Sequence, residues 1–209
     1  MAMPEEQRPV TRYSFGSALD ALSFTASKIG AVIEAAPLFW PLREWSAGVA
    51  AQAPRRDYIE QMRALYKAFL EHWAYVRDPF GVELLASTPE AVWDIVINRA
   101  AKTRKGAGDC DDCTAALGSM ARCCGFDAMI RTVGVKSQNY PDHVHIVVDM
   151  QEQGYLPMDP VVEPKRNGFG YWPRGFKDWL WTTKGVLVWS STSPEEQIAN
   201  ISGVTVKGV

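Results

Sequence analysis

Residues 106–150 decide the fold class, and they read GAGDCDDCTAALGSMARCCGFDAMIRTVGVKSQNYPDHVHIVVDM. Residues 110–124 predict a helix, because apolar side chains recur at steps of three and four and Gly125 stands where a helix commonly ends. Beyond Gly125 apolar and other side chains alternate, so residues 129–135 and 143–150 predict strands. The hydrophobic period therefore changes within this stretch from that of a helix to that of a sheet.

The segments on either side keep the same order of helices followed by strands. Residues 56–76 predict a helix by their apolar spacing, and Thr88 and Pro89 predict the start of another, as N-cap and first helical residue. Residues 155–158 predict a third strand, and Ser193 begins a short late helix. We therefore predict an α+β fold, with a helical first half packed on an antiparallel sheet, rather than a doubly wound parallel sheet.

The length of the chain, 209 residues, allows one sizeable domain with additional segments. We predict an N-terminal helical or arm segment over residues 1–56, a main domain over 57–190 and a C-terminal tail over 191–209. Residues 13–53 mix Ala, Ser and Gly with scattered large apolar side chains. This composition fits either a helical layer of the domain or an arm that docks on a partner, and the sequence leaves both open.

Charge and composition exclude several classes of protein. Lys and Arg number 22 against 24 Asp and Glu, giving a net charge of −2, whereas a protein that binds nucleic acid through its phosphates needs a basic excess. Residues 29–41 form the most apolar stretch, but they include Glu34 and Pro37 and are too short to span a bilayer. The acidic start lacks the features of a secretory signal. We therefore expect no nucleic acid, no membrane span and a cytoplasmic protein with reduced thiols.

The chemistry-bearing segment is Gly-Ala-Gly-Asp-Cys-Asp-Asp over residues 106–112. It places Cys110 in the first turn of the predicted helix, where unpaired N–H groups and the positive end of the helix dipole favour a thiolate and can bind an oxyanion. Asp109, Asp111 and Asp112 act in the opposite direction, because nearby negative charge raises a thiol pKa. Ionisation of Cys110 therefore needs a neighbouring base.

Two histidines and one carboxylate are candidates to complete such a site. His143 and His145 face the same side of their predicted strand, roughly 7 Å apart, so only one of them can reach a given thiol. Asp159 ends the next predicted strand, and an antiparallel return would bring it beside the start of the histidine strand. A carboxylate in that position can orient the imidazole and stabilise its cation.

Cys110, His143 and Asp159, in this chain order and at these element ends, resemble the transglutaminase-like superfamily, whose core is papain-like. The similarity is greatest to its bacterial and phage-encoded branch, which has a Gly-Asp-Cys-Asp-Asp motif, a His-Val-aromatic strand and a Leu-Asp-Pro element. In this chain the corresponding residues are 108–112, 143–145 and 158–160. Residues 73–79 and 88–90 also look like that branch, and the resemblance covers residues 57–162.

The resemblance implies a Cys-His-Asp triad with Cys110 as nucleophile, His143 as base and Asp159 as orienting carboxylate. His143 is preferred to His145 because the family places its histidine directly before Val and an aromatic residue, and His145 occupies the aromatic position. The implied reaction is acyl transfer from a peptide or protein amide through a thioester. The acceptor stays open between water, as in a cysteine peptidase or amidase, and a lysine amine, as in a transglutaminase. Hydrolysis is preferred because water is always present.

The same resemblance implies a phage-encoded protein in the cytoplasm of a bacterial host, with incorporation in a virion as a further option. The alternative function is a structural or assembly protein that uses this fold as a docking module with little or no catalysis. Its partners would be phage structural proteins, bound through the N-terminal segment and an aromatic cluster. The cluster consists of Phe169, Tyr171, Trp172, Phe176, Trp179 and Trp181; core packing is the default explanation for it.

The four cysteines also raise the question of a metal or a disulfide. Cys110 and Cys113, followed by Cys123 and Cys124, suggest a zinc site, but one helix cannot direct all four at a single ion. Cys110, Cys113 and one histidine could still hold a metal, which stays a minority alternative. We expect no bound metal and no cofactor. Cys113 lies one helical turn from Cys110, so the sequence leaves open whether the two thiols can bond to each other.

Overall fold

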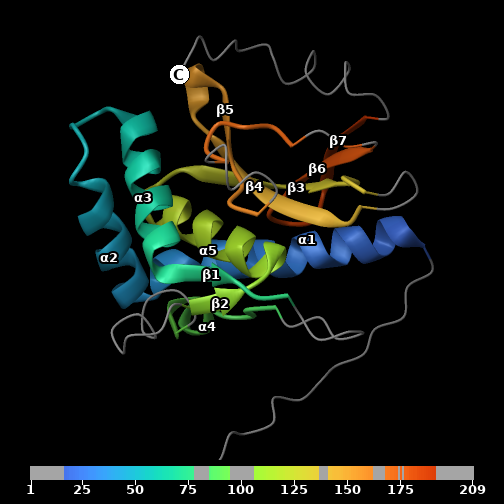
Figure 1. Cartoon of the computed structure of the whole chain (residues 1–209), viewed down its shortest axis with the longest axis horizontal. Coiled ribbons are helices and arrows are strands. Elements are labelled where there is room, and N and C mark those ends of the chain that lie inside the picture. Colours follow the sequence, from blue (N-terminus) through green and yellow to red (C-terminus); the bar gives the residue numbers. More distant parts are fainter. Residues whose placement is uncertain are drawn as a thin grey trace, which may run out of the picture.

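The structure is a computed structural model, and it describes residues 17–77, 85–94, 106–136, 141–161, 168–173, 175 and 177–191. Within these ranges an antiparallel sheet lies against a layer of helices, so the predicted α+β class is confirmed (Figure 1). The predicted late helix at Ser193 lies outside the described residues, and the predicted domain boundaries remain predictions.

The main sheet has five strands in the order β5-β4-β3-β6-β7, and all neighbours are antiparallel. The strands are β3 (Asp127–Val133), β4 (His143–Asp149), β5 (Tyr155–Met158), β6 (Asp178–Thr182) and β7 (Leu187–Ser191). A separate parallel pair joins β1 (Trp73–Tyr75) to β2 (Gly106–Gly108). The three strands predicted from alternation are β3, β4 and β5, whose observed limits differ by at most two residues from those predicted.

The helices contribute the other layer. They are α1 (Ala18–Ala35), the short 3-10 helix η1 (Ala36–Leu38), α2 (Trp40–Ala50), α3 (Tyr58–His72), α4 (Pro89–Trp93) and α5 (Cys110–Cys123). Helices α1 and α5 pack on the sheet, and α2 and α3 pack beside α5 (Figure 1). Of the two possibilities left open for residues 13–53, the described part forms a helical layer whose apolar side chains join the common core.

Helix α5 is the centre of the molecule, because residues Asp111 to Ala121 are all buried. Its small side chains permit this position. A Cβ atom at Gly118 would lie 2.5 Å from Cδ1 of Ile33 on α1 and 2.9 Å from Cδ1 of Ile146 on β4. The helix therefore fits between α1 and the sheet only where it lacks a side chain, and its N-terminus is held in a fixed position.

One predicted helix is shorter than expected. The apolar pattern predicts a helix over residues 56–76, but α3 ends at His72 and Trp73 has extended backbone angles. Trp73 to Tyr75 instead pair with β2, and the N–H of Val76 donates to the carbonyl oxygen of Gly108 at 2.8 Å. Pairing with a distant segment therefore overrides the local period at this point. The predicted start of α4 at Thr88 is confirmed, since its side chain accepts the N–H of Ala91.

Strands β6 and β7 were not predicted, and they form a hairpin that lies against α1. Ser23 of α1 donates its hydroxyl to the carbonyl oxygen of Gly185 at 2.8 Å. Gly185 has a φ angle of 73°, which favours glycine in this turn. At Gly30 a Cβ atom would lie 1.8 Å from the carbonyl oxygen of Thr183, so α1 and the hairpin touch through their backbones.

No single helix in the described residues has both the length and the apolar character needed to cross a membrane. The segments Leu19–Leu38 and Trp40–Ala50 meet that test only when they are taken together, across an 83° bend.

Replacing glycine by alanine inside a helix usually stabilises a protein. The close contact at Gly30 predicts the opposite effect there. Gly30→Ala should lower the free energy of unfolding by about 1–3 kcal/mol, because the new methyl group overpacks the hairpin. The matched control is Gly48→Ala on α2, where a Cβ atom meets nothing within 4 Å. That change should raise the free energy of unfolding by up to about 1 kcal/mol. Urea unfolding followed by circular dichroism measures both, and equal stabilisation by the two changes would contradict the packing described here.

Candidate active site

Cys110 is the first residue of α5, and the chain reaches it through β2. Asp109 is the N-cap residue, and its side chain accepts a hydrogen bond from the backbone N–H of Asp111. The preceding Gly108 leaves room for Asp112, because a Cβ atom there would lie 2.5 Å from the Oδ2 atom of that residue. The Cys110 side chain is half-buried, so it lies at the boundary between the interior and solvent.

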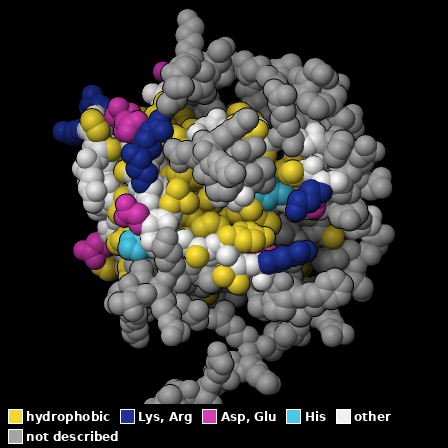
Figure 2. Space-filling model, in the orientation of Figure 1, with side chains coloured by type: hydrophobic (Ala, Val, Ile, Leu, Met, Phe, Trp, Pro, Cys, Tyr) yellow, Lys and Arg dark blue, Asp and Glu magenta, His cyan; other side chains and the backbone are white. Residues whose placement is uncertain are grey.

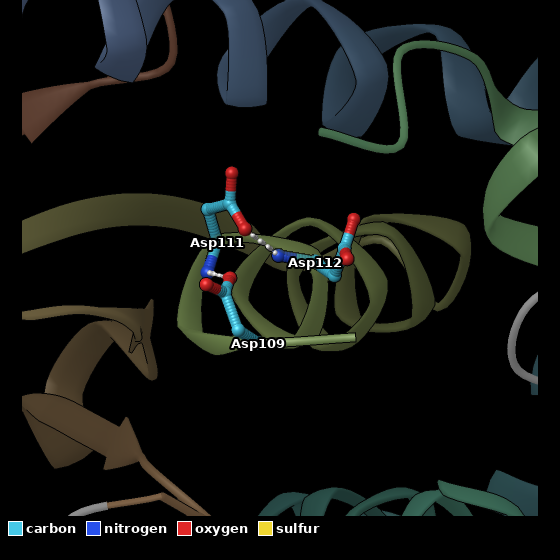
Figure 3. Close-up of side chains that lie close together, drawn as sticks. All are labelled: Asp109, Asp111 and Asp112. Carbon is cyan, nitrogen blue, oxygen red and sulfur yellow. Dashed lines mark hydrogen bonds between the residues drawn. The ribbon is translucent and has the colours of Figure 1, made fainter. Parts of the chain in front are cut away.

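Three carboxylates surround this helix start (Figure 3). Asp109, Asp111 and Asp112 are buried, and one oxygen from each lies within 4.8 Å of the others. Figure 3 shows Asp109 accepting from the N–H of Asp111 at 3.3 Å, and Asp111 accepting from that of Asp112 at 2.7 Å. Asp112 in turn accepts the N–H of Ala86 at 2.8 Å. An acidic group of this kind resembles a cation site, but here Asp109 and Asp111 accept N–H groups of the first turn of α5 and Asp112 accepts that of Ala86.

His143 and Asp159 are joined by a buried hydrogen bond. The Nε2 atom of His143, at the first position of β4, lies 2.7 Å from the Oδ2 atom of Asp159, which follows the end of β5. The other carboxylate oxygen accepts the N–H of Val161 at 2.9 Å. Burial alone would raise the pKa of Asp159, but the hydrogen bond from His143 and the nearby His145 hold it below its ordinary value. Asp159 is therefore a carboxylate positioned to orient the His143 ring.

His145 has a different environment from His143. It is fully buried, its Nε2 atom lies 3.0 Å from the Nη1 atom of Arg131, and its Nδ1 atom lies 3.1 Å from the carbonyl oxygen of Ile146. Burial and the Arg131 charge lower the pKa of His145 to about 3. With both ring nitrogens occupied and its charged form disfavoured, His145 is unsuited to accept a proton from a thiol.

Thr114 connects the start of α5 to the start of β4. Its hydroxyl lies 2.6 Å from the carbonyl oxygen of Cys110 and 3.2 Å from that of Val144, the residue after His143. One hydroxyl group therefore contacts the backbone of Cys110 and the backbone next to His143. Thr114 is not predictable from the sequence, because a threonine inside a helix gives no signal by its spacing.

Burial and nearby negative charge raise the pKa values of Tyr66, Tyr75 and Cys113. Burial and Asp159 raise the pKa of Cys113 and of Tyr66, so Asp159 lies close to α5 and α3 as well as to His143. Burial, Asp109 and Cys110 raise the pKa of Tyr75. Tyr75 lies on β1 with half of its surface exposed, and β1 pairs with β2, the strand that leads to Cys110.

None of the four cysteines, which all lie in the described part of the chain, forms a disulfide, so Cys110 and Cys113 are not bonded to each other. Cys113 is buried, and its Sγ atom lies 3.4 Å from the carbonyl oxygen of Cys110 within the helix. Cys123 and Cys124 lie at the opposite end of α5, about 20 Å away along its axis. Burial raises the pKa of Cys123 to about 11 and that of Cys124 to about 12. A single ion cannot bind all four.

The aromatic cluster predicted from the sequence divides between the core and this site. Trp181 is buried and donates its Nε1–H to the hydroxyl of Thr132 at 3.0 Å. The ring of Phe169 packs on Tyr66, and the ring of Trp172 lies under the guanidinium of Arg131. Phe176 lies outside the described residues.

Figure 2 shows mainly hydrophobic side chains across the middle of the face on which α5 and β4 lie in Figure 1, with a histidine beside them.

Comparison with known proteins supports the fold only. No protein-family model matches the chain, and no curated protein matches it significantly. The chain is similar to the crystal structure of a protein from Parabacteroides distasonis ATCC 8503 that is described as a "putative protease". The TM-score is 0.51 and the sequence identity 12%, over 92% of this chain and 36% of that one. The chain thus spans about a third of that protein's length and shares the fold of part of it.

The buried pair of His143 and Asp159 predicts a pH dependence of stability. Asp159 has a folded pKa below its ordinary value of 3.8, so its contribution to stability is present above that value and is lost as the pH falls through the folded pKa. Between about pH 4 and pH 2 the wild type should therefore lose more free energy of unfolding than Asp159→Asn. Urea unfolding across this range measures the difference, and a constant separation of the two curves would contradict the prediction.

Proposed function

We propose that the protein is a thiol-dependent hydrolase that cleaves an amide bond in a peptide or protein, with Cys110, His143 and Asp159 acting together. The observation that carries the proposal is the hydrogen bond between His143 and Asp159. It forms at the start of β4, where the Thr114 hydroxyl contacts both the carbonyl oxygen of Val144 and that of Cys110 at the start of α5. The fold shared with part of a protein described as a "putative protease" agrees with it.

The proposed reaction begins with proton transfer from the Cys110 thiol to His143. Because Asp159 occupies Nε2 of His143, the proposal assigns this transfer to Nδ1. The resulting imidazolium lies next to a carboxylate, which stabilises it. The thiolate lies in the first turn of α5, where the helix dipole favours negative charge.

The thiolate then attacks the amide carbonyl carbon and forms a C–S bond. The oxyanion of the tetrahedral intermediate would be bound by backbone N–H at the start of α5. The N–H groups of Asp111 and Asp112 donate to carboxylates. We assign the oxyanion to the N–H of Cys110 because it belongs to the nucleophile itself, at the first position of α5. His143 protonates the departing amine, which leaves a thioester on Cys110. His143 next removes a proton from water, which attacks the thioester carbonyl carbon. The C–S bond breaks, His143 returns the proton to the sulfur, and the carboxylic acid and the free thiol are released.

A lysine amine in place of water would make the same site a transglutaminase. The first half of the reaction is identical, and the acceptor alone differs. Hydrolysis remains the proposal because water reaches a half-buried thiol without a second binding site.

An assembly function is the second candidate, and exposed apolar side chains favour it. Leu38 and Trp40, at the junction of η1 and α2, are 88% and 59% exposed, and Val186 and Val188 beside the β6–β7 turn are more than half exposed. Such groups suit contacts with other proteins. A phage-encoded origin and a place in a virion belong to this candidate and rest on the resemblance of the sequence.

A peptide library tests the proposal. The protein is incubated with peptides from a proteome digest, with and without a biotinylated primary amine, and products are identified by mass spectrometry. The wild type should produce new carboxyl termini or hydrolysed side-chain amides, and Cys110→Ala should produce none, because the thioester cannot form. Amine incorporation that exceeds hydrolysis would replace the hydrolase by a transglutaminase. Equal activity of Cys110→Ala and wild type would contradict the mechanism.

A further inference from the structure

A second group of buried polar side chains lies behind His143, on neighbouring strands of the sheet. Arg131 of β3 is paired in register with His145 of β4, and Asp178 is the first residue of β6. Arg131 is 1% exposed, and His145 and Asp178 are not exposed at all. A buried ion pair is costly to desolvate and adds little to stability compared with apolar side chains of the same size. Its presence beside the candidate base therefore calls for another explanation.

The hydrogen bonds of this group leave one arrangement of protons. Arg131 donates Nε–H to Asp178 at 2.7 Å, Nη2–H to Asp178 and to the carbonyl oxygen of Pro173, and Nη1–H to Nε2 of His145 at 3.0 Å. A guanidinium group has no acceptor, so Nε2 of His145 must offer a lone pair. The proton of His145 therefore lies on Nδ1, which donates to the carbonyl oxygen of Ile146.

The ring of His145 is also fixed by its faces. The rings of His143 and His145 are nearly parallel, with centroids 6.0 Å apart and 19° between their planes. Trp172 presents its ring at 74° to His145, with centroids 6.4 Å apart, and its face lies 5.2 Å from the guanidinium of Arg131. Asp159 thus holds one edge of the His143 ring, and one face of that ring is turned to His145, whose two ring nitrogens are both hydrogen-bonded.

We propose that Arg131, Asp178 and His145 are positioning residues for His143: they hold His145 as a neutral Nδ1–H imidazole that keeps the His143 ring in the plane needed to serve Cys110. The proposal rests on the proposed function, in which His143 is the base. It gives a role to the histidine that replaces the aromatic residue expected at position 145. The imidazole of His145 is flat like an aromatic ring, and hydrogen bonds to Arg131 and Ile146 hold its two nitrogens.

The charges around His145 make its neutrality matter. Arg131 from β3 and His143 from β4 disfavour a proton on His145, whereas Asp159 favours one. Asp178 from β6 compensates the Arg131 charge. A protonated His145 would repel the imidazolium that His143 becomes when it takes the thiol proton. Holding His145 neutral therefore protects the charged form of His143 at mildly acidic pH.

The first test determines the protonation of His145 in the wild-type protein. Nitrogen-15 NMR of the histidine side chains should show His145 with a proton on Nδ1 and a bare Nε2, unchanged from pH 5 to pH 8. A proton on Nε2, or a titration within this range, would overturn the proposal whatever the other measurements show. This readout needs no substrate and no variant.

The second test follows alkylation of Cys110 by iodoacetamide against pH, with mass spectrometry to assign each thiol. The double variant Arg131→Met/Asp178→Leu removes both charges, so neither is left buried alone. Its reactivity at low pH should fall, moving the acid limb of the profile upward by about one pH unit, because Nε2 of His145 loses the Arg131 donor that opposes its protonation. Leu156→Ala, a buried change on β5 outside this group, is the control for general destabilisation and should leave the limb in place.

A third variant, His143→Ala, separates the two proposals. If it slows alkylation of Cys110 and the double variant leaves the acid limb unchanged, the positioning role is wrong and the proposed function stands. If His143→Ala has no effect, the proposed function fails and the positioning role fails with it. If the double variant does not fold, Arg131→Met/Asp178→Asn replaces it: loss of the Arg131 donor should again raise the acid limb, and an unchanged limb would overturn the role.

Discussion

The burial of α5 on all sides is the constraint on which the rest of the structure depends. Gly118 allows α1 and β4 to approach α5 closely, and the side chains of Asp111 to Ala121 are all buried, so α5 has little room to shift. The helix start is therefore fixed relative to the sheet, and three aspartates hold the surrounding backbone to it. Cys110 occupies the one position of this helix that combines a first-turn location with access to solvent. A reactive group there is held by the core rather than by a loop.

The charged groups around Cys110 act in opposite directions on the ionisation of its thiol. The acidic groups at the helix start disfavour a thiolate, and the pair of His143 and Asp159 supplies a stabilised place for the proton. The neighbouring His145 stays neutral, and its partner Arg131 is compensated by Asp178. The two polar groups lie side by side, and we propose separate tasks for them: proton transfer for one and the position of the ring for the other.

The sequence predicted the fold class and the pairing of His143 with Asp159, because both follow from short-range patterns: the change of period after Gly125 and the return of the chain after a turn. It missed what depends on distant contacts. Trp73 to Tyr75 continue a helical spacing but pair with β2. Strands β6 and β7 were not predicted, because their aromatic residues are typical of any buried segment and do not indicate a strand. Arg131 and Asp178 lie 47 residues apart, and nothing local indicates that an arginine in a strand will be buried against an aspartate. The preference for His143 over His145 came from the family resemblance, whereas the burial of His145 against Arg131 was not visible in the sequence.

The central claim is that Cys110 and His143 share a proton. The most direct measurement is the ultraviolet absorbance of the Cys110 thiolate against pH, taken as the difference between the wild type and Cys110→Ser, in the presence and absence of the His143→Ala change. The account predicts a thiolate already present at neutral pH in the wild type, and its disappearance at that pH when His143 is replaced. A Cys110 that ionises only in the alkaline range of an ordinary thiol, with or without His143, would contradict it.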